Sequence, residues 1–117
     1  MKKMFILLVM LSLTAIAFAR PEIFQLTGRV SMLRVHEVGT KYGPHNDQID
    51  VEAVVQLNTQ QGKSFGFKLR NDGNAQARQG MLDLLREAFT NNWNVTIEYD
   101  LAHGKNNGIL LRVWVTR

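Results

Sequence analysis

Over residues 24–115, one amphipathic helical stretch interrupts a pattern in which apolar residues alternate with polar ones. Over residues 75–90 the apolar side chains recur at steps of three and four, which is the period of a helix with one buried face. Three runs before this stretch and two after it alternate with a period of two, which is typical of strands with one buried face. The pattern therefore predicts the order β-β-β-α-β-β and a β-rich α+β fold.

The first alternating run, residues 24–38, is the longest, and its apolar phase slips by one residue. Such a slip is what a β-bulge produces, and Gly28 permits a sharp coil of the strand nearby. A long first strand that bends part-way along can serve two sheets of a small barrel. The residues expected on its inner side are Leu26, Gly28, Val30 and Met32 before the slip, and Leu33 and Val35 after it.

The four later runs predict strands with regular inner positions. In the second run Val54 is the one apolar residue out of phase, and Asp50 and Glu52 are expected on a solvated outer face. The inner residues are Ile49, Val51, Ala53, Val55 and Leu57 in the second strand, Phe65, Phe67 and Leu69 in the third, Val95, Ile97 and Tyr99 in the fourth, and Ile109, Leu111, Val113 and Val115 in the fifth. The helix is expected to bury Ala77, Met81, Leu84, Leu85, Ala88 and Phe89.

This element order predicts a five-stranded Greek-key barrel of the OB-fold type, with its one helix between strands three and four. An α+β sandwich with the helix packed on one face is the alternative. The bulged first strand and the position of the helix both favour the barrel.

Residues 1–19 have the composition of a secretory signal peptide. Lys2 and Lys3 precede residues 5–19, of which 13 out of 15 are apolar, and Ala17 and Ala19 form the small-x-small pattern that signal peptidase reads. The run is too short for a membrane span. We expect cleavage after Ala19, which leaves residues 20–117 as a single exported domain, either periplasmic or secreted.

Composition favours binding over catalysis. The chain has no cysteine, which excludes disulfides and thiolate metal sites. Its net charge of +4 falls to +2 without the two leader lysines, too little to indicate a nucleic-acid protein. Ser31 and Ser64 lie in strand patterns without a nearby His and acid, and the three histidines, His36, His45 and His103, lack ligand spacing. No enzyme activity, metal or cofactor is therefore predicted.

Two polar loops form the predicted binding surface. The ligand face of an OB-fold is built from the loop between strands one and two and the loop between strands four and five, beside strands two and three. Here those loops are residues 39–48 and 102–108, and planar polar side chains beside one aromatic ring suit a glycan or a protein partner. The candidate ligand-binding residues are Lys41, Tyr42, His45, Asn46, Asp47, Lys105, Asn106 and Asn107. The alternative is that Tyr42 folds back and only covers the barrel mouth.

Residues 30–36 with Gly39 after them, residues 81–89 and residues 95–99 carry a resemblance to a known family. They resemble the B subunits of bacterial pentameric toxins, especially the subtilase-cytotoxin and pertussis-like typhoid-toxin type. The resemblance implies a non-enzymatic OB-fold that forms a homo-oligomer, such as a pentamer. Those subunits usually carry a disulfide, which this chain lacks, and no glycan-site residue is carried over from them. The alternatives are a solitary periplasmic OB-fold protein of the stress-associated type and, less favoured, a single-stranded nucleic-acid binder.

Overall fold

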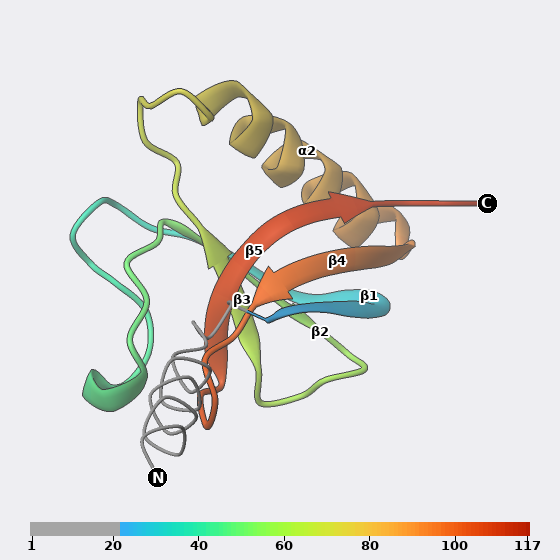
Figure 1. Cartoon of the computed structure of the whole chain (residues 1–117). Helices are drawn as coiled ribbons and strands as arrows, with labels where there is room; N and C mark the ends of the chain where they lie inside the picture. The colour runs from blue at the N-terminus through green and yellow to red at the C-terminus, as the bar shows by residue number, and fades with distance from the viewer. Residues whose placement is uncertain (1–21) are drawn as a thin grey trace, which may run out of the picture.

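The structure, a computed structural model, describes residues 22–117; the predicted signal peptide and its cleavage site lie outside the described residues. Five strands form a closed barrel, and one α-helix lies between the third and the fourth (Figure 1). The strands are β1 (Ile23–Val35), β2 (Ala53–Leu57), β3 (Ser64–Phe67), β4 (Asn94–Asp100) and β5 (Asn107–Trp114); the helix is α2 (Ala75–Asn91), and a 3₁₀ turn, η1, spans His45–Asp47. The predicted OB-type barrel is confirmed.

The barrel closes in the order β1-β2-β3-β5-β4. The long β1 is shared between two neighbours, because its first half pairs with β4 and its second half with β2. The parallel contact between β3 and β5 is short and joins Ser64 to Asn107 and Gly66 to Ile109. This contact places the start of β5, and the hairpin before it, beside the β2–β3 side of the barrel.

The predicted bulge in β1 is confirmed, although it falls slightly earlier than the pattern indicated. Val30 pairs with Leu57 and Met32 with Gln56, so Ser31 is the extra residue. Val30 therefore faces the core and Leu33 packs against it. The strand ends at Val35, which is 55% exposed rather than inward, and not at residue 38.

A second bulge, in β5, overturns part of the predicted inner face. Glu98 pairs with Arg112 but Tyr99 pairs with Leu110, which leaves Leu111 as the extra residue. Leu110 is consequently the buried residue, and Ile109 and Leu111 are exposed. The prediction that Ile109 and Leu111 point inward is wrong because strict alternation assumes an unbroken ladder.

The core fills the barrel and continues under α2. Leu85 and Ala88 are the fully buried residues of the helix, whereas Phe89, which was expected inside, is 52% exposed. The core residues are Val30, Ala53, Val55, Leu57, Phe65, Phe67, Leu85, Ala88, Val95, Ile97, Tyr99 and Leu110. Within residues 22–117 no helix has the length and apolarity that a bilayer crossing requires.

Candidate functional site

The loop of residues 39–48 folds back over the outer face of β2 and β3. Tyr42 and Ile49 exchange two backbone hydrogen bonds of 2.9 and 2.8 Å, which close the neck of the loop. The segment that follows the loop packs closely on β3, because a methyl group at Gly66 would overlap the side chain of Val51 and press on that of Ile49. This packing brings Tyr42 onto the β2–β3 face.

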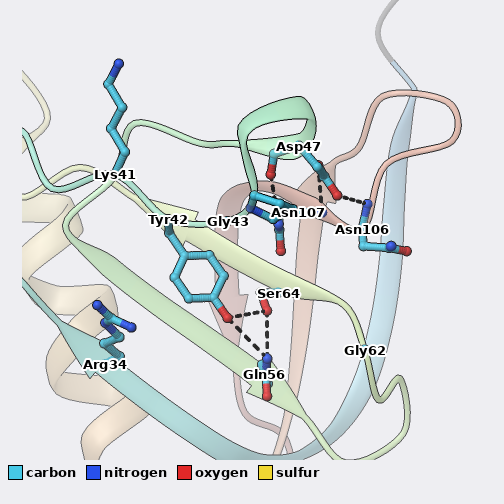
Figure 2. A pocket seen from close by; sticks show the side chains of 11 residues that line it. Arg34, Lys41, Tyr42, Gly43, Asp47, Gln56, Gly62, Ser64, Asn106 and Asn107 are labelled. Carbon is cyan, nitrogen blue, oxygen red and sulfur yellow. Dashed lines mark hydrogen bonds between the residues drawn. The ribbon is translucent and has the colours of Figure 1, made fainter.

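The phenol of Tyr42 is anchored on that face by a three-member hydrogen-bond cluster (Figure 2). The amide nitrogen of Gln56 donates to Ser64 Oγ at 2.8 Å and to Tyr42 Oη at 3.5 Å. The two hydroxyl oxygens of Tyr42 and Ser64 lie 3.2 Å apart. Because both the backbone and the phenol are held, the half-buried ring has a fixed orientation, and in Figure 2 no labelled side chain crosses the ring face turned to the viewer.

Two cations line the cavity that contains the ring. The guanidinium carbon of Arg34 lies 5.7 Å from the ring centroid, in the range of a cation–π contact, while Lys41 extends away from the ring (Figure 2). Neither cation takes part in an ion pair with any residue between 22 and 117. Lys41 adopts a left-handed backbone (φ 59°), which for a side chain other than glycine is a strained conformation typical of functional loops.

Asp47 joins the two predicted loops. Its carboxylate accepts hydrogen bonds from the backbone N–H groups of Asn106 and Asn107, at 2.8 and 3.4 Å. The side-chain amide of Asn107 donates back to the Asp47 carbonyl at 2.9 Å, and Lys105 Nζ donates to the Asn46 carbonyl. The loops therefore meet at one end of the barrel as predicted.

An open cavity of about 470 Å³ lies between these loops and the β2–β3 face. It brings together five of the eight predicted residues, namely Lys41, Tyr42, Asp47, Asn106 and Asn107. The other three, His45, Asn46 and Lys105, line a neighbouring cavity of about 360 Å³ that shares Asp47 and Asn107.

Six lining residues were not predicted as site residues, and three of them carry polar side chains: Arg34, Gln56 and Ser64. The outward phase of Gln56 on strand two was visible in the sequence, and an OB-fold ligand lies beside that strand. No sequence signal placed Ser64 or Arg34 in the site, because both reach it only through strand pairing.

The expectation that Glu52 lies on a solvated face is wrong. Its side chain is 3% exposed, and its carboxylate accepts hydrogen bonds from Arg70 Nε at 3.0 Å, Arg70 Nη2 at 2.8 Å and the backbone N–H of Leu69 at 3.0 Å. The same guanidinium donates to Asp50 at 2.6 Å. Arg70 thereby holds the pKa of Glu52, and that of Asp50, below the ordinary carboxyl value, although burial of Glu52 acts the other way.

Two further candidates for chemistry, Ser64 and His36, are engaged in structural contacts. Ser64 is buried and bonded to Gln56 and Tyr42, and His36 Nε2 lies 2.6 Å from the carbonyl oxygen of Val51, to which it donates. In the part of the chain that the structure describes, no group of three or more His, Cys, Asp or Glu side chains converges on a metal-sized site.

The fold and the cavity together define an OB-type barrel with an open polar cavity on its β2–β3 face. Comparison of the chain with known protein families, curated proteins and solved structures gives no match.

Proposed function

We propose that this chain is an exported, non-enzymatic OB-fold binding protein that takes a glycan in the β2–β3 cavity. The observation that carries the proposal is the Tyr42 ring, which is held at both ends beside amide side chains. A cavity of about 470 Å³ falls in the range of about 300–1,000 Å³ that is usual for small-ligand sites.

The chemistry of the cavity matches the two sides of a sugar ring. The C–H face of a pyranose packs on an aromatic face, and its hydroxyls need donors and acceptors at the edge. Tyr42 supplies the face, and the amides of Asn106, Asn107 and Gln56 supply both donors and acceptors. Arg34 and Lys41 add donors for a hydroxyl or an acidic substituent.

The ordered loops also favour binding. Asp47 ties the loop of residues 39–48 to the hairpin of residues 102–108 without a ligand. A site that is already ordered loses little conformational entropy when a ligand binds. Weak single-site affinity for a glycan would gain from several copies, as in the toxin B subunits that the sequence resembles.

The test is a screen of the protein on an array of neutral and acidic oligosaccharides, followed by titration with the best binder. Tyr42→Ala should weaken binding at least about tenfold, since the stacking surface is lost. Tyr42→Phe keeps the ring and should retain most of the affinity. His103→Ala is the control, because His103 is exposed on the hairpin of residues 102–108, next to the cavity residues Asn106 and Asn107, but does not line the cavity itself.

Tyr42→Ala also removes the phenol contacts, so its free energy of unfolding should fall by about 1–2 kcal/mol, which thermal unfolding measures. Asn106→Ala keeps the ring and separates the two effects, because its side chain forms no hydrogen bond to another residue in the described range 22–117. Glycan binding that survives both Tyr42→Ala and Asn106→Ala would contradict the proposal. Binding only to oligothymidine would favour the alternative of a nucleic-acid binder. A protein that stays strictly monomeric and binds no glycan would favour the alternative of a solitary periplasmic protein.

A further inference from the structure

The junction between α2 and β4 fixes a tryptophan on the surface. Asn92 ends the helix in a left-handed conformation (φ 59°, ψ 40°), and the backbone N–H of Trp93 donates to the Ala88 carbonyl at 2.9 Å. This is the usual way in which a helix ends with its last carbonyl groups satisfied. Since β4 begins at the next residue, Asn94, the backbone of Trp93 is held on both sides.

The side chain of Trp93 is nevertheless 44% exposed. It lines a cavity of about 580 Å³, together with Asn92, Asn94, Val115, Thr116 and Arg117. An indole is the largest apolar side chain, and leaving nearly half of it in water forgoes burial that a barrel of this size would otherwise use. An exposed aromatic ring that borders a cavity offers a flat apolar face on which a ligand can stack.

The side chains around the indole are polar and unengaged. Within residues 22–117, those of Asn92, Asn94, Thr116 and Arg117 form no hydrogen bond or ion pair. The neighbouring Asn91 differs, because its amide donates to the Glu87 carbonyl at 2.9 Å and so caps the helix. Two amides, a hydroxyl and a guanidinium thus surround the ring and remain available to a ligand.

From this arrangement we propose that the Trp93 cavity is a second saccharide-binding site. A flat ring edged by amide and hydroxyl groups fits the C–H face and the hydroxyl edge of a sugar. The buried core of an interface between two copies is more apolar than the rest of a protein surface, whereas Val115 is the one aliphatic residue in this cavity.

The two cavities lie at opposite ends of β4. That strand begins beside Trp93 and ends at Asp100, just before the hairpin that meets Asp47 (Figure 1). Seven strand residues span about 20 Å, at about 3.3 Å per residue. The Trp93 site is therefore separate from the β2–β3 cavity and does not rest on the function proposed for that cavity. One chain that carries both sites would bind a branched or clustered glycan bivalently.

The fluorescence of Trp93 reports directly on this site. The chain contains two tryptophans, so Trp114→Phe leaves Trp93 as the one indole. Oligosaccharides that bind on an array of neutral and acidic glycans are then added in solution to this variant. A saccharide that covers the ring should protect the indole from quenching by acrylamide.

Substitutions in the cavity then test its composition. Trp93→Ala should weaken this binding at least about tenfold, whereas Trp93→Phe keeps part of it. Asn92→Gly preserves the left-handed cap, removes the amide and should lower the affinity several-fold. The matched control is Phe89→Ala, because Phe89 is a similarly exposed aromatic residue in the last turn of α2 but does not line the cavity.

Each remaining outcome overturns the inference. If no array glycan protects the indole, the cavity is not a saccharide site, whatever Tyr42 binds. If Trp93→Ala and Phe89→Ala both reduce the mass seen in light scattering and leave glycan affinity unchanged, the surface joins copies of the chain. If only Tyr42→Ala weakens glycan binding, the β2–β3 proposal stands and this one fails.

Discussion

At the residue scale, Gly43 holds the junction of the two binding loops. It has a positive φ of 104°, and a methyl group there would overlap the Asp47 carbonyl oxygen and the Asn107 amide. Gly43→Ala should lower the free energy of unfolding by more than about 2 kcal/mol, through backbone strain and overpacking. Hydrogen exchange at the backbone N–H of Asn106, which donates to the Asp47 carboxylate, should accelerate because the two loops separate.

Gly39 provides the control for this prediction. Its φ of 96° is similar, but no atom lies within 4 Å of the position that a methyl group would take. Gly39→Ala should therefore show the backbone penalty alone, about 1 kcal/mol, with exchange at Asn106 unchanged. Equal stability and equal exchange in the two variants would contradict the role assigned to Gly43.

Single residues also show how far the sequence could predict the site. Loop residues such as Tyr42 and Asp47 were predictable, because an OB-fold uses those two loops and Tyr42 is their one aromatic residue. Glu52 was not, because the residue that covers it, Arg70, comes 18 positions later, directly after the last residue expected in the third strand. Alternation shows which face a residue occupies but not what is later packed over it.

At the element scale, Arg70 connects the segment that follows β3 to Asp50 and Glu52, which directly precede β2. Glu52 is buried, and its pKa lies below its ordinary value of about 4.5 because it accepts three hydrogen bonds from Arg70 and the Leu69 backbone. A lowered pKa in the folded state means that the unfolded state binds the proton first as pH falls. The stabilisation by Glu52 is thus complete above about pH 4.5 and is lost as pH falls from there through the folded pKa.

Glu52→Gln should lower the free energy of unfolding by about 3 kcal/mol at neutral pH, since a buried pair loses one partner. Denaturant unfolding at a series of pH values should also show a shallower acid decline than in the wild type. Asp83→Asn is the control, because it removes an exposed ion pair with Arg86 and should change stability by less than about 0.5 kcal/mol. Identical pH profiles for Glu52→Gln and the wild type would show that the pair does not contribute in this way.

The order of the helix and strands was predictable from the sequence. Which residues of each strand face the core was predictable only in part. The bulge in β1 disturbs a run of apolar residues and so can be seen in the sequence. The bulge at Leu111 lies in a run where Ile109, Leu110, Leu111 and Val113 are all apolar, so either phase satisfies the pattern. The pairing of β5 with β4 decides between them.

At the scale of the whole molecule, the barrel leaves two strand edges without a partner strand in the part of the chain described. The first half of β1 pairs with β4 alone, and β5 beyond Ile109 also pairs with β4 alone. Ile23 on the first edge is 55% exposed, and Leu111 on the second is 38% exposed. Unpaired, apolar edges readily add a strand from another chain.

Two different edges on one chain favour head-to-tail association, which closes into a ring when the rotation between neighbours allows it. We therefore expect the protein to form a homo-oligomer, with a pentamer as one such ring, and light scattering at micromolar concentration to give a multiple of the chain mass. Ile23→Lys or Leu111→Lys should each reduce the particle to a monomer, because a charged side chain on an edge opposes pairing. Val38→Lys makes the same kind of change at a 59% exposed residue outside every described strand, and it should leave the mass unchanged. A wild-type protein that stays strictly monomeric under these conditions would show that the edges are tolerated rather than used, and any avidity for glycans would then have to come from the two cavities of a single chain.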